Sequence, residues 1–138
     1  MCSYFSGNLH LEEEPGEPFF LVGEDLSFKS PHLGVTVTVK KGEGTDLYSV
    51  PRPGRSIVSS LQKSSIPAVL HDHAYRKQIF GRKGRKWADK LLLSAMKCIN
   101  EESIARGNGR FFSRTKMSAL YTSVRLGGWV SYQRYTIS

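Results

Sequence analysis

The chain has 138 residues, a length suited to one compact domain, because two separate cores of this total size would each bury only marginal apolar surface. Hydrophobic residues at 39% and charged residues at 23% exclude disordered and fibrous classes. No apolar run approaches the roughly 20 residues that span a bilayer, and Glu12, Glu13 and Glu14 stand where a signal peptide would be apolar. We therefore expect residues 1–138 to form a single domain without a membrane span or signal peptide.

The formal net charge of +8 is unequally distributed along the chain. Residues 1–50 hold eight acidic and three basic residues, whereas residues 51–138 hold four acidic and seventeen basic ones. The basic half favours an anionic partner such as nucleic acid, phospholipid head groups or an acidic protein. It could equally attract the acidic half of the same chain.

Residues 1–50 alternate short β-type runs with turn signals. The runs cover residues 4–11, 19–22 and 25–29, and Pro and Gly residues separate the first two. Residues 35–39 form the clearest strand, because β-branched side chains fill every position. This half predicts a small N-terminal antiparallel β-sheet.

From residue 55 onward the apolar spacing becomes helical. Ile57, Val58 and Leu61 predict a short helix, and a helix over residues 65–78 follows, with Pro67 in its first turn. Two further helices are predicted, one over 85–99 and one that ends at Gly127-Gly128. The fold class is therefore α+β, a sheet followed by a bundle of about three helices. The helices on either side of residues 81–84 should form a hairpin.

The first helix of this hairpin carries a titratable group at the rim of its apolar face. Residues four apart share a helix face, so His71 and Tyr75 point the same way, whereas Asp72 lies about 100° round, beside Arg76. His73 is adjacent to Asp72, but it lies about 200° from His71 on a helix, so the two imidazoles would not share a zinc ion.

Asp89, on the second helix, is a carboxylate on an otherwise apolar face, where it is costly unless paired. If the hairpin is antiparallel, Asp89 can approach His71, fix one ring nitrogen and leave the other free as a base. Tyr75 should add a hydrogen bond to the same cluster. Alternatively, the pair is a structural hydrogen bond that ties two helices together. Spacing alone leaves both interpretations open.

Four motifs in a fixed order carry a resemblance to a known family. They are Ser49-Val50-Pro51-Arg52, then His71-Asp72-x-x-Tyr75, then Ala88-Asp89 with Met96, and finally Val124-Arg125-x-x-Gly128-Trp129. On these motifs, residues 35–132 resemble a phage and prophage family catalogued as domain of unknown function thirteen-fifty-three. The resemblance implies a bacteriophage or prophage origin and supplies no activity.

The His-Asp-x-x-Tyr helix, with an Asp on an antiparallel helix, is also similar to the catalytic arrangement of phospholipases A2. By this resemblance His71 would be the general base that activates water, and Asp89 would orient it. Tyr75 would hydrogen-bond Asp89, and Asp72 would ligate calcium.

The segment upstream of this helix differs from the glycine-rich calcium loop of those enzymes. Residues 45–55 contain only Gly54, so Asp46 is the candidate for a further calcium oxygen. Asp46 and Arg52 either belong to a site loop near His71 or form a local pair in a rigid turn.

Three further features each allow two interpretations. Residues 81–86 form either an anion-binding patch or a solvated loop. Arg125 is expected to be a buried partner of Asp72 or Asp46. Trp129, Tyr132 and Tyr135 form either an interaction surface or ordinary packing.

Two functions from different classes follow. The first is a non-catalytic phage protein in the virion or the host cytoplasm, which uses residues 51–138 to bind other phage proteins or an anionic surface of phospholipid or nucleic acid. The second is a small metal-assisted ester hydrolase with His71 as general base and calcium as its cofactor. An open pocket beside the free His71 nitrogen favours the enzyme, and a sealed network favours the non-catalytic class.

Overall fold

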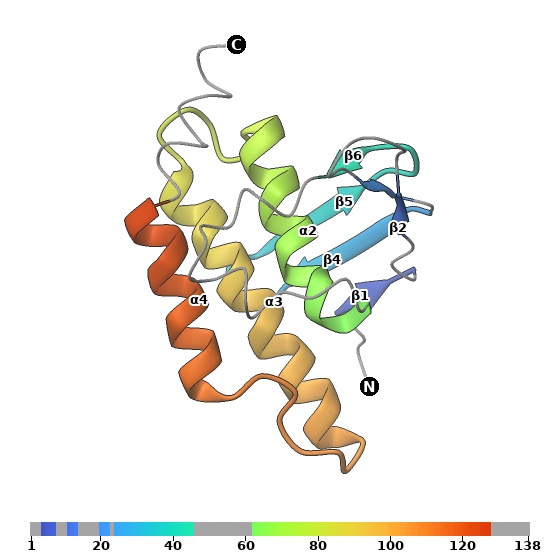
Figure 1. The fold of residues 1–138 in the computed structure, drawn as a ribbon, viewed down its shortest axis with the longest axis vertical. Coiled ribbons are helices and arrows are strands. Elements are labelled where there is room, and N and C mark those ends of the chain that lie inside the picture. Colours follow the sequence, from blue (N-terminus) through green and yellow to red (C-terminus); the bar gives the residue numbers. More distant parts are fainter. Residues whose placement is uncertain (1–3, 8–10, 14–19, 23, 46–61, 128–138) are drawn as a thin grey trace.

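The computed structural model describes residues 4–7, 11–13, 20–22, 24–45 and 62–127. In these ranges, short strands come first and long helices follow. The strands are β1 (Phe5–Ser6), β2 (Leu11–Glu13), β3 (Phe20–Val22), β4 (Leu26–Ser30), β5 (Val35–Val39) and β6 (Gly44–Thr45), and the helices are α2 (Gln62–Lys77), α3 (Arg85–Ala105) and α4 (Arg114–Gly127). This order confirms the predicted α+β class (Figure 1).

Strands β4 and β5 form an antiparallel hairpin that includes the predicted strand over residues 35–39. Leu26 pairs with Val39 and Phe28 with Val37, and these four side chains are buried on one face. Gly34 closes the turn at φ +67°, a left-handed conformation that favours glycine, and its N–H donates to the Ser30 carbonyl over 3.0 Å.

The other strands divide between two sheets. β1 pairs with β4 to give the order β1-β4-β5, and β2, β3 and β6 form a second antiparallel sheet in the order β2-β3-β6. The predicted run over residues 4–11 is thus split between β1 and β2. Gly7 comes directly after β1 and has a φ of +86°. It lies so close to the backbone of Asp25 that a Cβ at this position would collide with the Asp25 carbonyl oxygen.

Helix α2 begins earlier than its sequence predicts. It starts at Gln62, so Pro67 lies inside the helix and not in its first turn. Proline lacks an N–H and removes one hydrogen bond there. The burial of Ala68, Val69 and Leu70 immediately after it explains why the helix continues despite this loss. The predicted short helix at Ile57, Val58 and Leu61 lies outside the described residues.

Helix α3 continues six residues past its predicted end at residue 99. Asn100, a polar residue that ends the apolar pattern, is buried. Its amide nitrogen donates to the carbonyl of Phe112 over 2.9 Å, and its side-chain oxygen accepts from the N–H of Phe112 over 2.7 Å. These bonds satisfy the hydrogen-bonding capacity of the buried amide and connect the α3–α4 loop to α3.

The helices form two layers on the β1-β4-β5 sheet (Figure 1). α2 and α3 pack together as the predicted hairpin and contact β4 and β5, and α4 packs on α3. One core lies between this sheet and the hairpin and includes Phe28, Leu70 and Leu91. A second core between α3 and α4 includes Met96 and Leu120. No helix among the described residues is long and apolar enough to span a membrane.

Candidate functional site

Asp89 lies at the centre of a polar cluster between the three described helices. Its fully buried carboxylate accepts a hydrogen bond from Nε2 of His71 over 2.7 Å and one from the hydroxyl of Tyr75 over 2.5 Å. Its second oxygen accepts from Arg125 over 2.8 Å and from Arg85 over 3.3 Å. We call these five residues the Asp89 cluster.

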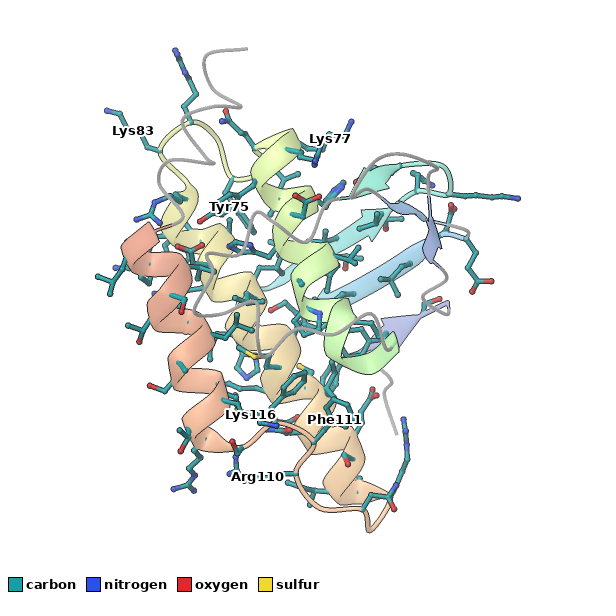
Figure 2. The ribbon with its side chains drawn as sticks, in the orientation of Figure 1. Tyr75, Lys77, Lys83, Arg110, Phe111 and Lys116 are labelled. Atoms are coloured by element: carbon teal, nitrogen blue, oxygen red, sulfur yellow. The ribbon has the colours of Figure 1, made fainter. Side chains whose placement is uncertain are left out.

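The positions of these residues follow from helix periodicity. His71 and Tyr75 are one turn apart on α2, and their rings lie 4.1 Å apart at a tilt of 44°. Arg85 and Asp89 are likewise four residues apart, on α3. Tyr75 lies where α2 faces α3 (Figure 2). The antiparallel hairpin thus brings two one-turn pairs together, as the sequence predicts for His71, Tyr75 and Asp89.

Arg85 links the cluster to the end of α4. Its guanidinium donates to the carbonyls of Val124 over 2.9 Å and Arg125 over 3.2 Å. The last carbonyls of a helix lack intrahelical partners and form the negative end of its dipole, so a cation is favourable there. Arg85 is not among the predicted site residues, although its spacing of four residues from Asp89 is a signal for an ion pair on one helix face.

The His71 imidazole is fully buried and asymmetric in its bonding. Nε2 donates to Asp89, and Nδ1 is buried without a hydrogen-bond partner in the described part of the chain. A carboxylate on one nitrogen fixes the tautomer and leaves the other nitrogen as a proton acceptor. Chemically, this arrangement can abstract a proton from a molecule that reaches Nδ1.

The phenol of Tyr75 is held in its protonated form. Burial is the main cause that raises the pKa of Tyr75 far above its ordinary value of 10.0, and the adjacent Asp89 carboxylate raises it further. Tyr75 therefore acts as a hydrogen-bond donor to Asp89 throughout the neutral pH range.

Asp72, a predicted metal ligand, is fully buried and forms an ion pair with Arg76 one turn later, at 2.9 Å from Nε. Asp46, the second predicted ligand, and Arg52 lie outside the described residues. Calcium takes six to eight oxygen ligands, and no group of three or more His, Cys, Asp or Glu side chains in the described ranges could hold a metal. Calcium binding by Asp72 and Asp46 therefore stays a prediction.

The structure corrects the prediction for Arg125. The sequence predicts Asp72 or Asp46 as its partner, but its guanidinium bonds Asp89. The physical reason is that α4 packs on α3, so the end of α4 meets the face that carries Asp89. Trp129, Tyr132 and Tyr135 lie outside the described residues.

Two other histidines, His73 and His32, bond to side chains on distant segments of the chain. Nδ1 of His73 lies 2.5 Å from a carboxylate oxygen of Glu43, which joins α2 to the segment after β5. Nδ1 of His32 lies 2.7 Å from the hydroxyl of Ser94, which also bonds Ser30. No regular spacing in the sequence connects these residues, because each pair joins distant elements.

The loop between α2 and α3 carries its basic side chains into solvent. Arg82 and Lys83 are exposed, and Lys83 projects from the tip of the molecule, with Lys77 on the same side (Figure 2). The exposure of Arg82 and Lys83 agrees with the interpretation of this segment as a solvated loop. Their charges remain accessible to an anion.

The fold and the Asp89 cluster define a small α+β protein with a buried His–Asp–Tyr network. The model of the family described as protein of unknown function (DUF1353) matches residues 20–108. The chain belongs to this family. The matched range contains the positions of His71 and Asp89, and it ends before Val124. A search of curated proteins and a search of solved structures each found no match.

Proposed function

We propose that this chain is a non-catalytic phage or prophage component, which acts in the virion or in the host cytoplasm and uses the Asp89 cluster for stability. The observation that carries this proposal is the saturation of Asp89. Its buried carboxylate accepts bonds from four side chains on three helices, two of them arginines. A buried carboxylate with this many partners favours a structural role, because an unpaired buried charge is strongly destabilising.

The surface of the helical half supports binding to an anionic partner. The acidic residues of α2, α3 and α4 are all engaged: Asp72 by Arg76, Asp89 by its cluster, Glu101 by the hydroxyl of Tyr4, and Glu102 by Arg106 and the N–H of Tyr4. The lysines and arginines of these helices outnumber the four carboxylates, so the helical half keeps a net positive charge. An acidic surface of another phage protein is the partner this charge distribution fits.

Two carboxylates of the N-terminal half, Glu43 and Asp25, have partners among the described residues. An ion pair between His73 and Glu43 joins the two halves of the chain. Asp25 bonds to the ammonium group of Lys40 and the backbone N–H of Lys41, both in its own half.

A second candidate function is ester hydrolysis, and the bonding of His71 favours it. Nδ1 would accept a proton from water as the water oxygen bonds to the ester carbonyl carbon. The proton would pass to the leaving oxygen when the carbon–oxygen bond breaks. Asp89 would orient His71, and Tyr75 would hold Asp89. Calcium, with Asp72 and Asp46 as ligands, belongs to this candidate.

One variant separates the two functions. A structural role predicts that His71→Gln lowers the melting temperature by several degrees, because it disturbs a buried network at a cost of about 1–3 kcal/mol. It also predicts no hydrolysis by the wild type on a panel of esters and phospholipids, with calcium or with chelator. His32→Gln, at an exposed histidine, is the matched control and should change the melting temperature less.

The opposite result would establish the enzyme. Wild-type hydrolysis that His71→Gln abolishes at a nearly constant melting temperature would contradict the structural role.

The phage assignment has its own test, which is mass spectrometry of particles purified from the strain that encodes this chain. Presence of the chain in particles places it in the virion, and its presence only in infected or induced cells favours host interaction. Expression independent of phage genes would contradict both.

A further inference from the structure

A groove of about 570 Å³ lies between α3 and α4, away from the Asp89 cluster. Its floor is apolar and includes Leu93, Ile104 and Met117. A smaller hollow of about 280 Å³ adjoins it and shares Leu93, Lys97 and Tyr121 with it. The volume of the groove lies within the range of about 300–1,000 Å³ that is typical of small-molecule sites.

Three cations border this groove. Lys97 lies on α3, Arg110 on the α3–α4 loop and Arg114 at the start of α4, and all three are exposed. No acidic side chain in the described ranges forms an ion pair with any of them. Glu101, the acidic residue of the lining, accepts a hydrogen bond of 2.8 Å from the hydroxyl of Tyr4.

The groove leaves a large apolar side chain in solvent. Ile104 is 51% exposed, in the last turn of α3 and close along the chain to Arg110. Arg110 and Lys116 lie at the end of the molecule opposite Lys77 and Lys83, so the groove and the α2–α3 loop are separate basic regions (Figure 2). An apolar floor with a cationic border is complementary to a ligand with one apolar part and one anionic part.

We infer that the α3–α4 groove binds a single-chain anionic phospholipid, with the acyl chain on the apolar floor and the phosphate head group on Lys97, Arg110 and Arg114. The volume suits one chain. Guanidinium groups bind phosphate oxygens through paired hydrogen bonds, and the three cations outnumber the single carboxylate of the lining, Glu101, so positive charge remains for an anionic head group. The groove lining includes one aromatic ring, Tyr121, so successive bases of a single-stranded nucleic acid would lack a row of stacking partners there. This inference is independent of the proposed function of the Asp89 cluster.

Calorimetric titration of the full chain with myristoyl lysophosphatidylglycerol, below its critical micelle concentration, tests the inference. The wild type should bind saturably with one molecule per chain. Arg114→Gln should weaken binding at least about tenfold, through loss of charge-assisted hydrogen bonds to phosphate. Lys116→Gln is the matched control, because it removes the same charge from α4 outside the groove, and binding should change less than about twofold.

Two further probes and one further variant complete the test. Glycerol phosphate, which lacks the chain, and myristoyl lysophosphatidylcholine, whose head group is zwitterionic, should bind much more weakly. Ile104→Asp, a surface substitution, should abolish binding while circular dichroism shows the native helix content. Absence of wild-type binding would overturn the inference. Equal loss in Arg114→Gln and Lys116→Gln, or equal binding of the two lysolipids, would also overturn it and indicate non-specific adsorption.

Discussion

Helix α3 carries two regions that contain the same residue types and differ in how those residues are partnered. In the Asp89 cluster, Arg85 and Arg125 meet a buried carboxylate and, in the case of Arg85, helix carbonyls. In the α3–α4 groove, Arg110 and Arg114 border an apolar floor with no ion pair in the described ranges. Burial and partners thus separate the arginines that stabilise the Asp89 cluster from those that are free to bind a ligand at the groove.

Replacement of Asp89 should have the largest effect on stability. Asp89→Asn leaves two arginines beside a neutral group and removes charge-assisted bonds from His71 and Tyr75. We expect the free energy of unfolding to fall by about 3–5 kcal/mol, measured by chemical denaturation. Glu101→Gln, at an exposed carboxylate on the same helix, should cost no more than about 1 kcal/mol. Equal losses in the two variants would contradict the importance of the cluster.

The two kinds of arginine should respond differently to the same substitution. Arg125→Gln removes a charged hydrogen bond of 2.8 Å to buried Asp89 and should cost about 1.5–3 kcal/mol of stability. Arg114→Gln, at an exposed position, should stay within about 0.5 kcal/mol of the wild type. A larger loss for Arg114→Gln than for Arg125→Gln would reverse the assignment of the two regions.

Tyr75→Phe should cost about 1 kcal/mol at neutral pH, the typical net value of one hydrogen bond. Its effect should shrink in alkali. The folded state raises the pKa of Tyr75, so above about pH 10 the phenol ionises more readily in the unfolded chain and wild-type stability falls. Tyr75→Phe lacks this loss. Denaturation curves at rising pH should therefore converge, and a constant gap between the two proteins would contradict the raised pKa.

The smallest effect is expected for a single exposed lysine of the α2–α3 loop. The wild type should be retained on immobilised heparin at low ionic strength and released by added salt, because exposed cations are strongly screened. Lys83→Gln should elute at slightly lower salt, with unchanged stability. Failure of the wild type to bind heparin at low ionic strength would contradict the account of an uncompensated basic surface.

The sequence predicts those parts of the site that depend on local periodicity. His71, Tyr75 and Asp89 were identifiable because a one-turn spacing and a carboxylate on an apolar helix face have direct energetic consequences. The partner of Arg125 depends on which helix α4 packs against, and no local pattern encodes that choice. The pattern also gives no reason to distinguish Ile104, which is half exposed, from the buried apolar residues of the same helix.

The fold shows the same division. The hairpin of α2 and α3 and the strand over residues 35–39 follow from apolar spacing and β-branched composition. The extension of α3 through Asn100 does not, because the burial of that amide depends on bonds to Phe112 on the following loop and to Met117 on α4. The split of the first β-run at Gly7 likewise depends on the approach of the chain at Asp25.

The most direct test of the central claim, a structural network shared by three helices, is a double-mutant cycle between Tyr75→Phe and Arg125→Gln. The two side chains come from α2 and α4 and bond different oxygens of Asp89. If the cluster is one cooperative unit, the double variant should differ from the sum of the single variants by about 0.5 kcal/mol or more. Additivity within about 0.3 kcal/mol would show that the two bonds are independent and would contradict the claim.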